Sequence, residues 1–65
     1  MSYKIVNNEE EYRGLMKNLE RYKFHWASGK NPTDESVLLH IDFPIKIIFN
    51  PYGGCTKEIA YSHNI

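Results

Sequence analysis

The stretch that decides the fold lies between residues 8 and 22 and reads NEEEYRGLMKNLERY. Asn8 can accept a hydrogen bond from the free amides of a first helical turn, and Glu11 can return a bond in a capping box. Apolar side chains then recur at spacings of three and four, which is the period of one helical face. They are Tyr12, Leu15, Met16, Leu19 and Tyr22. We therefore predict an amphipathic helix from Asn8 to Tyr22.

Extended segments lie on both sides of this helix. Short runs rich in β-branched and aromatic residues, or alternating apolar with polar residues, predict strands. These are Tyr3 to Val6, Phe24 to Ala27, Val37 to Ile41, Ile45 to Phe49 and Thr56 to Ser62. Phe24 and Trp26 would share one face of their strand, as would Ile59 and Tyr61 in the last one. Pro44 marks a bend, a bulge or an edge, which leaves open whether the third and fourth runs form one bent strand or two.

The element order that follows is β-α-β-β-β-β, with a turn at Asn50 to Gly54. The helix must bury its apolar stripe, and one face of the sheet is the surface that it can cover. We predict a single two-layer α+β domain over residues 1–65, with a four- to five-stranded, mainly antiparallel sheet. So short a chain has marginal stability. Cys55 is the single cysteine, so no disulfide within the chain can help, and we expect a homo-oligomer.

The charge balance narrows the classes of partner. Eight basic residues match eight acidic ones, whereas duplex-DNA binders carry a basic excess that replaces phosphate counterions. The longest mostly apolar stretch, Val37 to Phe49, is too short and too polar to span a bilayer. The first residues lack the charged and apolar regions of a signal peptide. We expect a soluble, cytoplasmic protein, with which a lone cysteine is consistent.

Metal binding and catalysis have little support in the sequence. The soft metal ligands are His25, His40, His63 and Cys55, and no two of them lie at a recognised zinc spacing. Cys55 follows two glycines, a context that indicates the end of a turn rather than an activated nucleophile. We predict no metal, no cofactor and no catalytic residue in a protein that is not an enzyme.

The segment Trp26-Ala27-Ser28-Gly29-Lys30 has the composition of an anion-binding turn. Trp26 offers a surface on which a base can stack. Ser28 can donate a hydrogen bond, Gly29 lets backbone amides approach an anion, and Lys30 supplies charge. Four further residues would complete such a site if the fold brings them near: Thr33, Arg13, Arg21 and Tyr22. The structural alternative places Trp26 in the core, Ser28 and Gly29 in a turn, and Lys30 in solvent.

Residues 26–33 carry the pattern Trp-x-Ser-Gly-x-x-Pro-Thr. With the helix opening Asn-Asn-Glu-Glu-Glu-Tyr, its Leu-Met-x-x-Leu run and the closing Ile59 to Ser62, this pattern resembles a group of small proteins encoded by phages and prophages of Gram-positive bacteria. Many such proteins act against the host. Viral sponge proteins, for example, sequester the cyclic-nucleotide signals of defence systems such as CBASS and Thoeris. The chain departs from the commoner pattern at Asp34-Glu35-Ser36, where relatives often carry an aromatic residue.

The resemblance implies a non-enzymatic anti-defence protein that sequesters a cyclic di- or oligonucleotide in the bacterial host cell, commonly as a small oligomer. Trp26 would then stack a base, Ser28 and the Gly29 amide would hold phosphate, and Lys30 or an arginine would neutralise charge. The alternative is a small phage inhibitor that binds a host or defence protein. The acidic cluster Glu9 to Glu11 and nine aromatic residues favour it, because one small core cannot cover nine aromatic side chains and exposed ones suit interfaces.

Overall fold

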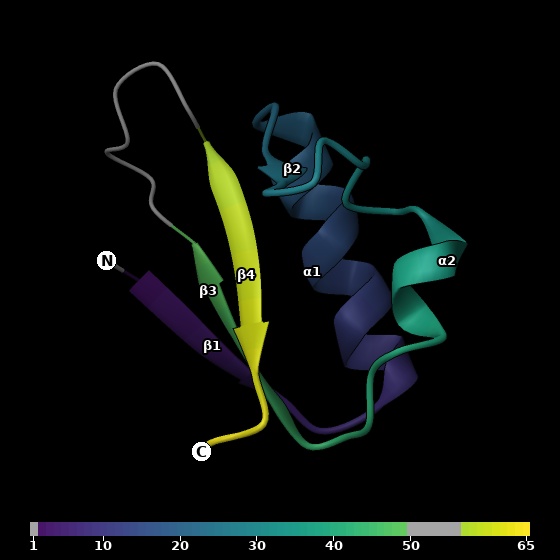
Figure 1. The fold of residues 1–65 in the computed structure, drawn as a ribbon, viewed down its shortest axis with the longest axis vertical. Helices are drawn as coiled ribbons and strands as arrows, with labels where there is room; N and C mark the ends of the chain where they lie inside the picture. The colour runs from purple at the N-terminus through teal and green to yellow at the C-terminus, as the bar shows by residue number, and fades with distance from the viewer. Residues whose placement is uncertain (1, 50–56) are drawn as a thin grey trace.

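The computed structural model describes residues 2–49 and 57–65. Within them, one long helix packs on a four-stranded mixed sheet (Figure 1). The elements are β1 (Ser2–Val6), α1 (Glu9–Arg21), β2 (His25–Trp26), α2 (Glu35–Leu38), β3 (Ile45–Phe49) and β4 (Glu58–Ser62). The predicted α+β class is thereby confirmed. The predicted turn at Asn50 to Gly54 and the single cysteine, Cys55, lie outside the described residues.

Helix α1 is capped much as its sequence predicts. Asn8 is the N-cap, and its Oδ1 accepts a hydrogen bond from the Glu11 amide at 2.9 Å. Glu11 returns a bond through Oε1, but it accepts from the amide of Asn7, at 2.9 Å, rather than from that of Asn8. Tyr22 is the C-cap. Both predicted helix ends are therefore confirmed as caps, and they satisfy backbone groups that the helix itself leaves unpaired.

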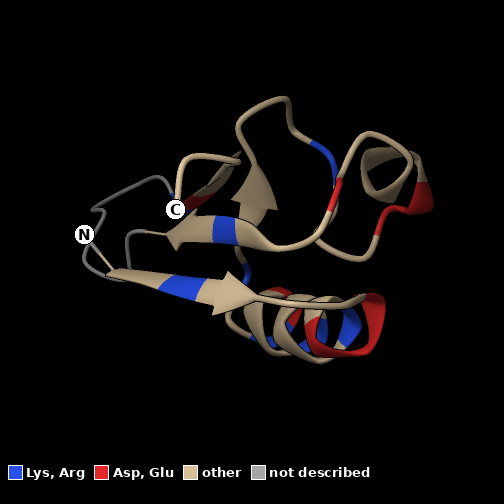
Figure 2. Cartoon of the chain, turned by 90° about the horizontal axis from the view of Figure 1, so that it is seen from below, with Lys and Arg blue, Asp and Glu red and all other residues tan. Residues whose placement is uncertain are grey.

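The strand order in the sheet is β1-β3-β4-β2. The first two neighbouring pairs are antiparallel and the β4–β2 pair is parallel, so the sheet is mainly antiparallel. Strands β1 and β2 form its two edges, and α1 connects them across β3 and β4. Both helices lie on the same side of the sheet (Figures 1 and 2). Figure 2 also shows acidic residues in the first turn of α1 and at α2, and basic residues in β1 and β3.

The core lies between the sheet and the helices. Residues directly opposite one another in paired strands share a face, and the pairs Val6–Ile45 and Phe49–Ile59 face α1. The buried hydrophobic residues are Val6, Tyr12, Met16, Leu19, Phe24, Trp26, Val37, Ile41, Ile45, Ile47 and Ile59. Tyr3, Tyr22 and Tyr61 remain exposed. The expectation that some aromatic residues reach the surface is confirmed.

The prediction of a strand from Val37 to Ile41 is wrong, because Val37 and Leu38 end α2, and Leu39 and His40 form the turn that follows it. Asp34 caps α2, and its Oδ1 accepts bonds from the amide and hydroxyl of Ser36 at 2.9 and 2.7 Å. Such a local bond competes with strand pairing. Val37 and Ile41, four residues apart, are both buried, whereas Leu39 is 84% exposed. A strand would place all three on one face. The element order is thus β-α-β-α-β-β.

Candidate functional site

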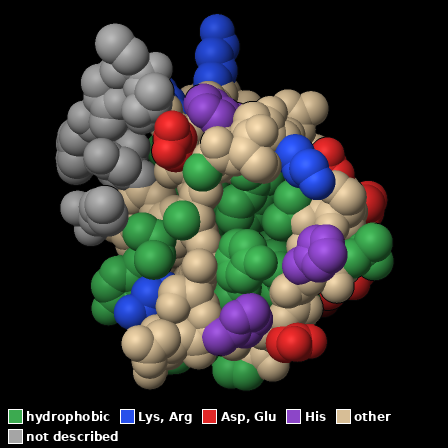
Figure 3. All heavy atoms as spheres, in the orientation of Figure 1, with side chains coloured by type: hydrophobic (Ala, Val, Ile, Leu, Met, Phe, Trp, Pro, Cys, Tyr) green, Lys and Arg blue, Asp and Glu red, His purple; other side chains and the backbone are tan. Residues whose placement is uncertain are grey.

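A groove of about 400 Å³ lies between β4 and the segment that runs from β2 through α2. It is lined by Trp26, Ala27, Ser28, Lys30, Val37, His40, Ile59, Ala60 and Tyr61. The space-filling view shows a hollow with a hydrophobic floor, and histidine and lysine side chains on the surrounding surface (Figure 3). We call this hollow the Trp26 groove. It brings together Trp26, Ser28 and Lys30, three of the predicted ligand-binding residues.

A tight turn places these residues beside one another. The Trp26 amide donates to the carbonyl of Lys30 at 2.9 Å, and the Gly29 amide donates to the carbonyl of Trp26 at 2.7 Å. Gly29 has φ 93°, in the left-handed region that glycine adopts without strain. Its amide is already used inside the turn, so Gly29 contributes the backbone conformation and not the anion donor that the sequence suggested. Ser28 and Lys30 are left exposed on the turn.

Trp26 itself is 5% exposed and belongs to the core, as the structural alternative predicts. Its Nε1 is buried and has no hydrogen-bond partner among residues 2–49 and 57–65. The indole meets the Tyr61 ring edge to face, with ring centroids 5.9 Å apart. Tyr61 is 38% exposed, so it is the groove aromatic that offers a larger accessible surface for stacking. Tyr61 was not among the predicted ligand-binding residues, although the alternation in β4 already placed it on the same face as Ile59.

Lys30 is held by neutral oxygen rather than by a carboxylate. Its Nζ donates to the Ser36 hydroxyl at 3.0 Å, and that hydroxyl donates to Asp34. The hydrogen bonds from Ser36 lower the pKa of Asp34 below its ordinary value, and the charge of Lys30 adds to this effect. In the described part of the chain, both ion pairs involve Arg13. The ammonium group of Lys30 is thus kept at the groove by an uncharged partner.

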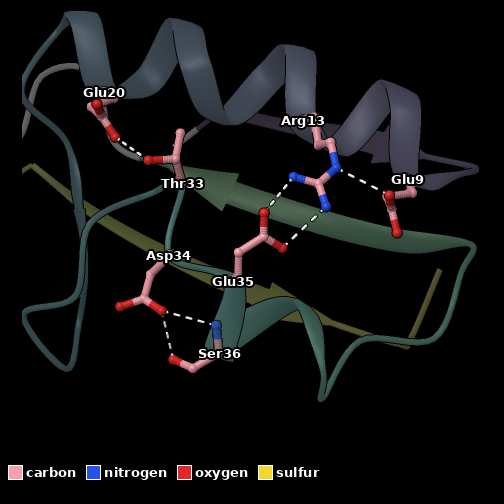
Figure 4. A network of polar contacts seen from close by, with 7 residues as sticks. All are labelled: Glu9, Arg13, Glu20, Thr33, Asp34, Glu35 and Ser36. Carbon is pink, nitrogen blue, oxygen red and sulfur yellow. Dashed lines mark hydrogen bonds and ion pairs between the residues drawn. The ribbon is translucent and has the colours of Figure 1, made fainter.

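Arg13 and Thr33 do not join the Trp26 groove. They line a smaller cavity of about 210 Å³ between α1 and α2, where carboxylates engage them (Figure 4). Arg13 donates to both oxygens of Glu35 and, at 3.0 Å, to Glu9. These hydrogen bonds raise the pKa of Arg13 above its ordinary value. Thr33 donates to Glu20. The two residues fasten the α2 segment to α1 instead of offering groups to a ligand.

The remaining predicted residues lie elsewhere. Tyr22 is 65% exposed and lines a third hollow, of about 370 Å³, beside Phe24, Phe49 and Lys57. Lys57 donates through Nζ to the Tyr22 carbonyl at 3.2 Å. Arg21 is exposed in the last turn of α1 and lines none of these three cavities. The predicted residues are therefore spread over several places, and the groove lining also includes six residues that were not predicted, of which His40 and Tyr61 carry polar groups in their side chains.

Among residues 2–49 and 57–65, no group of three His, Cys, Asp or Glu side chains could hold a metal ion. In these same residues, no helix has the length and apolar character needed to cross a membrane. The chain matches no protein-family model, no curated protein and no solved structure.

Proposed function

We propose that this chain is a non-enzymatic phage anti-defence protein that binds a cyclic-nucleotide immune signal in the Trp26 groove and sequesters it. The observation that carries the proposal is the meeting of Trp26, Ser28 and Lys30 with His40 and Tyr61 in one hollow. Ligand pockets are typically concave and mostly apolar, with a few polar groups that fix orientation. The resemblance to small phage proteins supplies the biological class.

The groups around the groove suit the two parts of a nucleotide. Ala27 and Ala60 line the groove, are exposed, and provide apolar surface for a base, and the partly exposed ring of Tyr61 provides a stacking partner. Stacking of this kind contributes about 1–3 kcal/mol per base. The Lys30 ammonium and the Ser28 hydroxyl can hold a phosphate.

The size of the groove sets the expected ligand. Its volume of about 400 Å³ lies toward the lower end of the range of ligand pockets, about 300–1,000 Å³. We expect it to accept one nucleotide unit, so the second unit of a cyclic dinucleotide would lie outside the groove or in the groove of another copy.

Calorimetric titration with a panel of cyclic di- and oligonucleotides tests the proposal. Trp26 is the only tryptophan, so its fluorescence reports directly on the groove. We expect binding heat and a fluorescence change with at least one ligand. Lys30→Gln should weaken that binding by about tenfold or more, because it removes a charge-assisted hydrogen bond. Arg21→Gln makes the same charge change outside the groove and should bind normally. If no ligand gives either binding heat or a change in Trp26 fluorescence, the proposal is wrong.

A protein-binding inhibitor is the second candidate, and one observation favours it. Leu39 and Tyr22 are 84% and 65% exposed, and exposed large apolar side chains are typical anchors of protein interfaces. A pull-down from host lysate distinguishes the two functions. A stoichiometric protein partner that is lost with Leu39→Ser or Tyr22→Ser, and kept with Lys30→Gln, would replace the nucleotide proposal.

A further inference from the structure

In the part of the chain that the structure describes, one face of the sheet carries no helix. Alternation along the strands places seven residues on the side opposite to the one that packs on α1: Tyr3, Ile5, Lys46, Ile48, Glu58, Ala60 and Ser62. We call these residues the open face. Their cross-strand pairs form two rows, Tyr3–Ile48–Ala60 and Ile5–Lys46–Ser62, and Glu58 lies at the other end of β4. Figure 1 shows both helices on the opposite side of the sheet.

The open face is more apolar than a solvent-facing sheet surface needs to be. Antiparallel strands with one face in water usually alternate apolar and polar residues. Strand β3 instead reads Ile45-Lys46-Ile47-Ile48-Phe49. Ile45 and Ile47 are fully buried toward α1, so Ile48 is an extra apolar residue on the open side. Ile48 is paired across the strands with Tyr3, which is 62% exposed. This pattern is typical of a strand that is covered on both sides.

We propose that a second copy of this chain covers the open face, by sheet-on-sheet packing about a two-fold axis. The charges are arranged for self-complementarity. Lys46 lies in the row at one end of the face and Glu58 lies at the other end, on the adjacent strand. An axis in the sheet plane, perpendicular to the strands and passing over the row of Ile48, exchanges these ends. It brings Lys46 of each copy beside Glu58 of the other, with Ile48 facing Ile48 at the centre.

The side chain of Lys46 lies on the open face, on the β1 side of β3. Its Nζ lies over the ring of Tyr3, 4.9 Å from the centroid, and therefore projects over the open face. Within residues 2–49 and 57–65, both ion pairs are formed by Arg13, so the charge of Lys46 is not neutralised by a described carboxylate. Glu58 of a second copy would supply that partner at the rim of the interface, where such pairs govern orientation more than affinity.

Pairing through the β1 edge is disfavoured by comparison. Lys4 is the middle residue of this five-residue strand. Two copies of β1 paired antiparallel about their centre would place Lys4 opposite Lys4, a like-charge pair of the kind that blocks edge-to-edge association. The open face has no such central charge. Three short strands make a small interface, so we expect a dissociation constant on the order of micromolar.

Sedimentation equilibrium over a concentration series tests this interface. We expect the wild type to form dimers. Ile48→Glu should weaken dimerisation by at least about tenfold, because it places two like charges against each other on the axis. The matched control is Tyr22→Ser, which removes an exposed apolar side chain from the end of α1 and should leave the dimer intact. Circular dichroism checks that each variant is folded.

A charge exchange provides a second, independent measurement. Lys46→Glu and Glu58→Lys should each weaken the dimer, and the double variant should regain most of the wild-type affinity. This cycle decides the question even if Ile48→Glu does not fold. A wild type that stays monomeric at all concentrations, a dimer insensitive to Ile48→Glu, or a double variant without recovery would each overturn the proposal. None of these results depends on nucleotide binding.

Discussion

Arg13 and Glu35 join α1 to α2 through two parallel hydrogen bonds, with Nη1–Oε1 and Nη2–Oε2 distances of 2.6 and 3.0 Å (Figure 4). Bidentate pairs of this kind fix geometry as well as contributing energy. The segment that they hold also carries Val37 and His40, which line the Trp26 groove. A surface ion pair therefore positions one wall of the proposed binding site.

We expect Glu35→Gln to lower the thermal midpoint slightly and to weaken ligand binding more clearly. The stability effect is small because the pair is exposed and screened by solvent. The binding effect follows from a looser groove wall. Differential scanning fluorimetry and calorimetry measure the two quantities. Glu10→Gln makes the same charge change in the first turn of α1 and should alter neither; equal effects of the two variants would contradict this role of Glu35.

Acid should destabilise the wild type more steeply than Glu35→Gln. The hydrogen bonds from Arg13 hold the pKa of Glu35 below its ordinary value of 4.5. A carboxyl group whose folded pKa is lowered stabilises the fold above its unfolded pKa, and this contribution is lost as the pH falls through the folded pKa. Urea unfolding at a series of pH values around and below 4.5 measures the difference. Parallel pH profiles for the two proteins would exclude a contribution from Glu35.

Ionisation of Tyr12 should lower the free energy of unfolding at high pH. Burial raises the pKa of Tyr12 from 10.0 to about 12, and the charge of Glu35 adds to the shift. A group with a raised folded pKa gives its full contribution below the unfolded pKa and loses it as the pH rises toward the folded value. Wild-type stability should thus fall between about pH 10 and pH 12. Urea unfolding follows this change, which should be smaller in Tyr12→Phe.

Near neutral pH, Tyr12→Phe should match or exceed the wild type in stability. The Tyr12 hydroxyl is buried and has no hydrogen-bond partner among the described residues, and an unpaired buried hydroxyl costs about 1 kcal/mol or more. Removing it leaves the ring and its edge-to-face contact with Phe43 in place. A marked loss of stability in chemical denaturation would mean that the hydroxyl has a partner after all.

Ile47→Ala should come close to unfolding the protein. Ile47 is fully buried in a central strand, and truncation of such a side chain costs about 2–5 kcal/mol. That is a large part of the total stability expected for a chain of this length. Leu39→Ala removes a similar volume from a side chain that is 84% exposed and should be nearly neutral. Urea midpoints compare the two, and similar losses would refute the assigned burial.

Local patterns predicted the local structure well. The limits of α1 follow from Asn8 and from the apolar period up to Tyr22, both of which act within one turn of the chain. The strand expected at Val37 to Ile41 is wrong because another local signal, a helix cap, was not recognised. Asp34 forms a cap with Ser36, and the apolar run alone did not distinguish a buried helix from a strand.

The sequence predicted only those residues of the candidate site that lie close together along the chain. Trp26, Ser28 and Lys30 come together because one turn contains them all. Tyr61 joins them only through the pairing of β2 with β4, which no local signal specifies. Arg13 was predicted as a ligand-binding cation, but its charge is taken up by carboxylates on two elements. Knowing this requires the tertiary structure.

The strand order β1-β3-β4-β2 has a consequence for how the chain is made. A ribosome releases both edge strands and the helix that links them before either central strand exists. Among the described residues, β4 is the strand with which β2 pairs, so the turn that carries Ser28 and Lys30 joins the sheet only once β4 is present. The Trp26 groove can therefore be completed only after β4 has been made, and a nascent chain interrupted within β3 would have both edge strands without the central pair that joins them.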